Sequence, residues 1–276
     1  MRALIIVVVM LGLGAHRDAR ANDAFGPVPR APASHSFKVG TLQLMSLRDA
    51  QIVLHNDGKT FGVDAGPAAV GELLKANGLP DDRITLGLAA LLVRTGHRVI
   101  LLDCGLGPKA RGNLLASLRA AGVSPEAVTD VAITHTHGDH AGGLNDAAGG
   151  LAFPKATIWM AAAEWAWIKG PPIAPGVTPI ALDGHTPGHV GYEIVSSKMR
   201  LLDISDLAHS SLVSLAKPEW TMGFDRDAVL AKATRKATLA RLARDQELVF
   251  APHFPFPGVG RVAVDGEGYA WRPATP

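Results

Sequence analysis

Cysteine is almost absent from this chain of 276 residues, since Cys104 is the only one. An internal disulfide framework is therefore excluded. Neither sign of charge is in clear excess, because the formal net charge at pH 7 is only +2. A nucleic-acid-binding protein normally carries a clear basic excess, so that class of protein is not expected. Internal repeats and low-complexity tracts are missing as well.

Hydrophobic residues, in contrast, are abundant and make up 47% of the chain. A chain of this length and composition can bury a large core, and the default expectation is one domain of the α/β class. Alternating apolar positions predict strand hairpins near residues 36–48, 86–103 and 261–271. Helical spacing predicts a helix over 110–121 and a long one that Asp225 caps and that runs to Arg244.

The first 21 residues have the pattern of a secretory signal peptide. Arg2 is followed by the apolar run Ala3 to Gly14, and Ala19-Arg20-Ala21 supplies a small-x-small cleavage site. The run is too short for a stable membrane anchor. We therefore expect a signal peptide at 1–21, a proline-containing N-terminal arm at 22–35, a folded domain at 36–276, and a periplasmic or secreted protein.

The most informative stretch is His135-Thr136-His137-Gly138-Asp139-His140. An apolar run, residues 131–134, precedes it and predicts a short buried strand, and glycines follow it. In an extended chain, residues two apart point the same way, so His135 and His137 present their imidazoles on one side. Asp139 and His140 come in the turn after the strand and face a neighbouring point. Three neutral nitrogens and one carboxylate suit Zn²⁺, so this loop predicts ligands for two adjacent metal ions.

Other acidic and histidine residues come at strand ends. Asp103 closes an apolar strand just before a glycine, where it can accept a hydrogen bond from a metal-bound histidine or cap a turn. Residues 183–189 read Asp-Gly-His-Thr-Pro-Gly-His, a tight turn that can hold a ligand. His185 and His189 compete for that role, and their spacing does not decide between them.

These stretches, in this order, resemble the metallo-β-lactamase superfamily, with its His-x-His-x-Asp-His signature. The resemblance implies a four-layer αβ/βα sandwich, in which two mixed sheets pack face to face with helices outside. It places the third-motif ligand at His189 and leaves His185 in the surrounding shell with Asp103. It makes Asp206 the metal-bridging carboxylate, with Asp203 as the alternative.

Carried over residue by residue, the resemblance implies a complete set of ligands for two zinc ions per chain, with other divalent metals left open. The first ion would take His135, His137 and His189, and the second would take Asp139, His140 and His253. Asp206 and a hydroxide would bridge the two ions. His209, three residues after Asp206, holds the offset of a proton-donating tyrosine in related lactonases, so it is either catalytic or an ordinary surface histidine.

Within the superfamily, the sequence is most similar to methyl parathion hydrolase and the acyl-homoserine lactonases. The similarity lies in Leu151-Ala152-Phe153-Pro154 with Glu164-Trp165, and in the tail from His253 to Tyr269. One departure is the short, proline-rich link at 169–176, where the family usually carries a longer insertion. The site is therefore expected to be more open, and the family's substrates do not transfer directly.

The resulting expectation is a dizinc hydrolase of a lactone, ester or phosphotriester that uses a metal-bridging hydroxide, with Asp139 orienting it. The alternatives are a mono-iron persulfide dioxygenase-type enzyme, a β-lactam hydrolase, and a zinc-binding protein without turnover. The expected partner is a small-molecule ester or lactone. A homodimer is left open.

Overall fold

The structure is a computed structural model that describes residues 25–160 and 173–274. The predicted signal peptide, Glu164-Trp165 and residues 169–172 of the short link lie outside these described residues. Among the described helices, none combines the length and the apolar composition needed to cross a bilayer.

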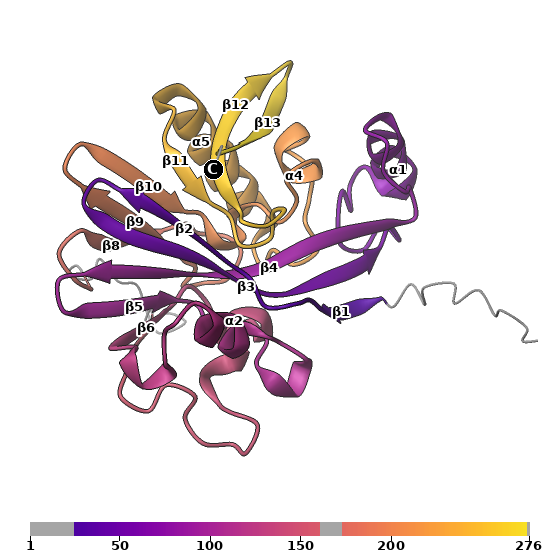
Figure 1. Cartoon of the computed structure of the whole chain (residues 1–276). Coiled ribbons are helices and arrows are strands. Elements are labelled where there is room, and N and C mark those ends of the chain that lie inside the picture. The colour runs from indigo at the N-terminus through magenta and orange to yellow at the C-terminus, as the bar shows by residue number, and fades with distance from the viewer. Residues whose placement is uncertain (1–24, 161–172, 275–276) are drawn as a thin grey trace, which may run out of the picture.

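The described residues form two mixed β-sheets (Figure 1). The first sheet has the order β1-β3-β4-β5-β6-β7, with β2 paired to β3, and only the β5–β6 and β6–β7 pairs are parallel. Its strands are β1 Gly26–Pro29, β2 Ser34–Val39, β3 Leu42–His55, β4 Arg83–Thr95, β5 Arg98–Leu102, β6 Asp130–Ile133 and β7 Thr157–Met160.

The second sheet has the order β13-β12-β11-β10-β9-β8, and its one parallel pair is β10–β11. Its strands are β8 Val177–Ala181, β9 Val190–Ser196, β10 Met199–Asp203, β11 Leu248–Phe250, β12 Val259–Asp265 and β13 Gly268–Pro273. The helices are α1 Gly66–Ala76, α2 Leu114–Ala120, α3 Gly138–Ala141, α4 Val213–Ala216 and α5 Ala228–Asp245. Short 3-10 turns are η1 Pro108–Ala110, η2 Pro125–Ala127, η3 Gly142–Leu144 and η4 Ser205–Leu207.

The period-2 alternation of the strands divides the apolar residues among three layers of contact. Leu91 and Ile100 point inward and pack against Ile194 and Leu201 of the second sheet. Their neighbours Leu92 and Leu101 point outward and pack under α2 with Leu118. The opposite face of the second sheet packs in the same way under Leu239 and Leu242 of α5. The result is the predicted order of helix, sheet, sheet and helix, with α2 and α5 on opposite outer faces (Figure 1).

Two expectations differ from the structure in detail. The N-terminal arm is in part a sheet strand, because residues 26–29 pair with residues 50–53 of β3. Pro27 and Pro29 are tolerated there because β1 is an edge strand. The long helix begins later than expected: Asp227 is its cap, with a carboxylate that accepts from the N–H of Leu230 at 2.9 Å, whereas Asp225 is engaged elsewhere.

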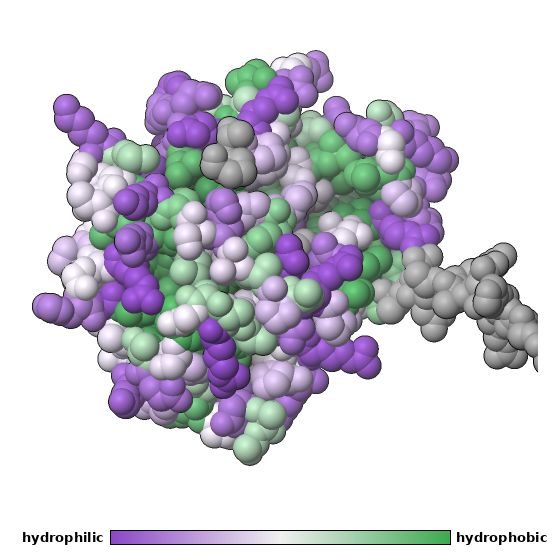
Figure 2. Space-filling view, in the orientation of Figure 1, coloured by the Kyte–Doolittle hydropathy of each residue, from purple (hydrophilic) through white to green (hydrophobic). Residues whose placement is uncertain are grey.

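The segment between β3 and β4 carries α1 out to one end of the long hairpin (Figure 1). It forms a small apolar cluster of its own, in which Phe61 and Val70 pack on Leu86 of β4 and on Val213 of α4. On the face shown in Figure 2, hydrophobic residues gather around this end of the molecule and elsewhere mix with hydrophilic ones. This cluster borders the cavity described below.

Candidate metal centre

The central loop follows β6 directly, as its sequence predicts. Strand β6 ends at Ile133, His135 and His137 follow in extended chain, and α3 begins at Gly138. The first turn of α3 contains Asp139 and His140. Three more segments reach the same point from the second sheet: the turn between β8 and β9 brings His185, η4, after β10, brings Asp206, and the turn after β11 brings His253.

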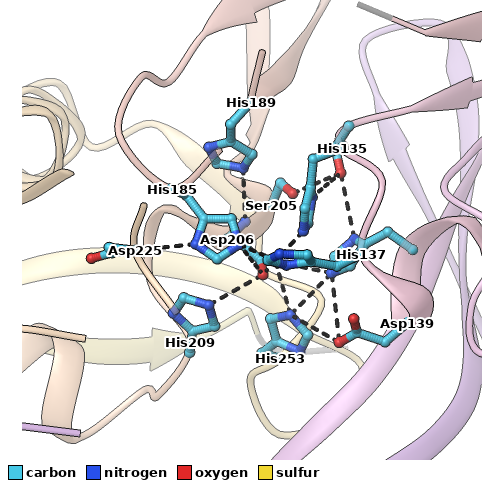
Figure 3. A network of polar contacts seen from close by, with 12 residues as sticks. His135, His137, Asp139, His185, His189, Ser205, Asp206, His209, Asp225 and His253 are labelled. Atoms are coloured by element: carbon cyan, nitrogen blue, oxygen red, sulfur yellow. Dashed lines mark hydrogen bonds and ion pairs between the residues drawn. The ribbon is translucent and has the colours of Figure 1, made fainter. Parts of the chain in front are cut away.

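Two groups of side chains have the spacing of metal ligands, with one candidate atom per residue and all such atoms within 4.8 Å of one another. The first group is His135, His137, His185 and Asp206. The second group is Asp139, His140 and His253. Figure 3 shows their side chains converging from separate segments of the chain.

The carboxylate of Asp206 lies between the two groups (Figure 3). Its Oδ1 is 3.0 Å from Nε2 of His140 and 2.9 Å from Nε2 of His253. Its Oδ2 is 3.1 Å from Nε2 of His185 and 3.5 Å from Nε2 of His135. One carboxylate thus faces both groups, one oxygen to each.

In the second group, each histidine donates its Nδ1 proton to an acceptor outside the group. Nδ1 of His140 donates to Asp103 at 2.7 Å, and Nδ1 of His253 donates to the carbonyl of Gly87 at 3.1 Å. In the neutral rings each Nε2 then carries a lone pair. These two nitrogens lie 3.3 Å apart and both face a carboxylate oxygen of Asp206. Two lone pairs so close together repel one another unless a proton or a metal ion lies among them, so this geometry can hold a metal ion.

The first group has the same character. Nδ1 of His185 donates to Asp225 at 3.1 Å, which leaves its Nε2 to face Nδ1 of His137 at 3.1 Å. Nε2 of His135 is buried and has no hydrogen-bond partner among the described residues. A buried polar atom without a partner is costly, and a metal ion would satisfy it. The set of imidazoles and carboxylates suits a transition-metal ion.

The charges of this cluster depend on one another. Burial by itself would raise the pKa of Asp206, but the surrounding histidines, His140 first, hold it well below its usual range. Burial lowers the pKa of His135 well below the ordinary value. For His185, burial also acts to lower the pKa, yet Asp206 and the hydrogen bonds to two carboxylates outweigh it and raise the pKa to about 9.

Asp103 occupies the place behind the ligands that its strand-end position predicts. It follows β5, which runs parallel to β6, so its carboxylate reaches the start of the histidine loop. It accepts from His140 and from the backbone N–H of Thr134 at 2.8 Å. Asp203, the alternative to Asp206, instead accepts from the N–H of Ser205 and belongs to neither group.

His189 lies in a different place from the one the resemblance implies. Its Nδ1 donates to the carbonyl of Leu182 at 2.8 Å, and its Nε2 accepts from the N–H of Asp206 at 3.2 Å. Both ring nitrogens are therefore engaged by the backbone, and burial lowers the pKa of His189 to about 3. It is His185, rather than His189, that stands in the first group of candidate ligand atoms.

A cavity of about 320 Å³ opens beside the two groups. His137, Asp139, Asp206, His209 and His253 line its polar side, and Ile52, Leu54, Leu86 and Phe224 line its apolar side. His209 is buried, and its Nε2 lies 3.1 Å from Oδ2 of Asp206. Its place in this wall excludes the reading of His209 as an ordinary surface histidine.

Sequence reasoning missed two residues that support the ligands. Asp225 accepts from His185 rather than capping α5. Gly87 contributes its carbonyl to His253, and no side-chain pattern signals that contribution. A signal for Asp225 existed in the Asp-x-Asp spacing ahead of α5, since one of the two carboxylates suffices for the cap.

Comparison with known protein families agrees with the fold and with the candidate metal centre. Residues 83–170 match the family model of the metallo-β-lactamase superfamily. That match includes the histidine loop and Asp103.

Individual relatives agree with this family. A 59-residue stretch is 52% identical to metallo-beta-lactamase domain-containing protein 1 of Mus musculus, covering 21% of this chain and 20% of that relative. The structure is similar to AidC, a dizinc quorum-quenching lactonase, with a TM-score of 0.82, 27% identity, and coverage of 89% of this chain and 98% of that one. It is also similar to the hydrolase AbOPH, with a TM-score of 0.81, 26% identity, and coverage of 90% and 99%.

Proposed function

We propose that this protein is a dizinc hydrolase that cleaves a small lactone, ester or phosphotriester. The observation that carries the proposal is the position of Asp206, whose two oxygens face two separate groups of nitrogen ligands beside an open cavity. A structural zinc site is normally closed by four protein ligands, whereas a catalytic one borders space for substrate.

In this proposal the first zinc ion takes His135, His137 and His185. The second takes Asp139, His140 and His253, and Asp206 serves both. His185 replaces His189 in the set because Nε2 of His185 faces the group and has no backbone partner, whereas both nitrogens of His189 are engaged by the backbone.

Bound zinc would supply a water-derived nucleophile at neutral pH and a Lewis acid for the oxygen of the scissile bond. The chain's own residues would position these components. Asp139, whose side chain is 21% exposed at the cavity, can orient the attacking water and receive its proton. Burial lowers the pKa of His209, and its Nε2–H donates to Oδ2 of Asp206 while the ring lines the substrate cavity.

The cavity supports an uncharged, partly apolar substrate. Its wall carries four apolar side chains, and the charged groups on it are those of the metal centre and its histidines. Its size falls in the range of small-molecule sites. The two structural neighbours at 26–27% identity, a lactonase and a hydrolase, support the same reaction class.

The test is to purify the protein, measure its metals by mass spectrometry and assay a panel. The panel holds an acyl-homoserine lactone, an aryl ester, a phosphotriester and a β-lactam. We expect two zinc ions per chain and turnover of at least one of the first three. One iron per chain with no hydrolysis would overturn the proposal in favour of a dioxygenase-type enzyme.

We also propose that residues 1–21 direct export, which would place the protein in the periplasm or outside the cell. Sequencing the N-terminus of the protein recovered from each cell fraction tests this. The expected mature chain begins at Asn22.

A further inference from the structure

Behind the metal centre lies a buried ion pair that links α5 to one of the ligands. Arg235 is 1% exposed, and the side chain of Asp225 is completely shielded. Nη2 of Arg235 donates to Oδ2 of Asp225 at 2.7 Å, while Oδ1 of Asp225 accepts from Nδ1 of His185 at 3.1 Å. Figure 3 shows Asp225 on the far side of His185 from Asp206.

The other two nitrogens of Arg235 donate to backbone carbonyls. Nε donates to Leu207 at 2.8 Å, and Nη1 lies 3.2 Å from the carbonyls of both Pro218 and Trp220. Leu207 directly follows Asp206. One guanidinium therefore holds both the carboxylate behind His185 and the turn that carries Asp206.

Such a buried ion pair contributes little to stability by itself. Burying two charges costs free energy that their attraction recovers only with good geometry and full hydrogen bonding, and a buried pair is weak evidence for stability alone. Here the carboxylate is shared between the arginine and an imidazole whose other nitrogen faces the first ligand group.

The two competing histidines differ in just this respect. His189 donates to a neutral backbone carbonyl, while His185 donates to a carboxylate. A carboxylate behind a histidine fixes the proton on the rear nitrogen and makes the front nitrogen a stronger metal ligand.

We propose that Asp225 and Arg235 are positioning residues of the metal centre, which set the orientation and proton of His185 and hold Asp206 in register with it. This inference rests on the proposed function. It predicts that the pair supports the ion bound by His135, His137 and His185 more than the ion bound by Asp139, His140 and His253.

The test compares zinc binding by the full chain with that of the Asp225→Asn variant, by titration against a chromogenic zinc chelator. We expect affinity for one of the two ions to fall about tenfold or more, a typical effect for the outer partner of a metal ligand, with the other within about twofold. In ¹⁵N-histidine spectra of the zinc-loaded protein, the Nδ1–H resonance of His185 should shift, while that of His140 should not.

A matched control is available in the first sheet. Asp130 is also 1% exposed and pairs with an arginine, Arg98, but it lies at the start of β6, away from the ligands. Asp130→Asn should lower thermal stability and leave both zinc affinities unchanged. If this variant weakens zinc binding as much as Asp225→Asn, the positioning role is wrong and the effect is general destabilisation.

A second variant keeps the test decisive if Asp225→Asn folds poorly. Arg235→Lys retains the charge but cannot contact all four acceptors. It should therefore lower the affinity for the same ion by a smaller factor. Two zinc ions of unchanged affinity in both variants would overturn this inference and leave the proposed function standing. A wild-type chain that binds no zinc pair would overturn both.

Discussion

Gly87 and His253 contact each other twice. The N–H of Gly87 donates to the carbonyl of His253 at 2.9 Å, and Nδ1 of His253 donates back to the carbonyl of Gly87 at 3.1 Å. This exchange takes place on a stretch of β4 that β5 does not cover, since β5 pairs only with residues 91–95. A free strand edge of the first sheet thereby aims a ligand carried by the second.

Replacing Gly87 by alanine should damage the second metal site. An added Cβ would lie 2.4 Å from the carbonyl oxygen of Phe254, so the turn that carries His253 must move. We expect about tenfold weaker binding of one zinc ion and roughly 1–3 kcal/mol lower stability from overpacking. Chelator competition and thermal unfolding measure the two effects.

The control for that variant is Gly71→Ala in α1. There the same methyl group meets its nearest neighbour, Cβ of Asp81, at 3.4 Å, which is ordinary contact. Zinc affinity should be unchanged and helix stability slightly increased. Unaltered zinc binding in Gly87→Ala would contradict the role assigned to the strand edge.

The proposed choice of His185 rather than His189 as the ligand has a direct consequence. His185→Ala should remove one zinc ion and abolish turnover. His189→Ala should retain two ions but lose roughly 1–3 kcal/mol of stability, because it leaves the Leu182 carbonyl and the Asp206 N–H without partners. Metal analysis of the two variants side by side decides the matter, and the opposite pattern would restore His189 as the ligand.

His209→Phe tests the role of the cavity histidine. The aromatic ring keeps much of the packing beside Phe61 and Phe224 but removes the contact with Asp206. We expect both zinc ions to remain while kcat falls about 10–100-fold. Full activity with intact metal content would exclude a part for His209 in the reaction.

The loss of stability at acid pH should depend in part on the charge of Asp130. Burial acts to raise its pKa, but Arg98, Thr129 and Trp159 donate to it and hold the pKa below the usual value. Its contribution is therefore present above the unfolded pKa of about 3.9 and is lost as the pH falls through the lower folded pKa.

Asp130→Asn should accordingly be less stable than the wild type by roughly 1–3 kcal/mol at pH 7. The difference should shrink as the pH drops below about 4, as urea unfolding at a series of pH values would measure. A deficit that stays constant to pH 2 would mean that packing, rather than charge, explains the loss.

The sequence predicts those parts of the site that depend on local chain geometry. His135 and His137 alternate in extended chain after a buried strand, and the turn that follows brings Asp139 and His140 alongside. Asp103 was also predictable, because parallel neighbours β5 and β6 end at the same edge.

The rest depends on contacts between distant segments. The choice between His185 and His189 rests partly on Asp225, which is 40 residues from His185. An aspartate before a helical pattern is normally interpreted as a cap, and Asp227 fills that role two residues later. The part played by Gly87 follows from sheet pairing, since its backbone rather than a side chain does the work.

The division of the ligands between two sheets also fixes when the centre can form. His140 and His253 approach each other across 113 residues of chain, and Asp206 belongs with the later of the two segments. During synthesis, the histidine loop emerges long before the carboxylate and the last histidine that complete it. Capture of the proposed pair of zinc ions would therefore come late, and a chain that stops before β11 should hold no such pair.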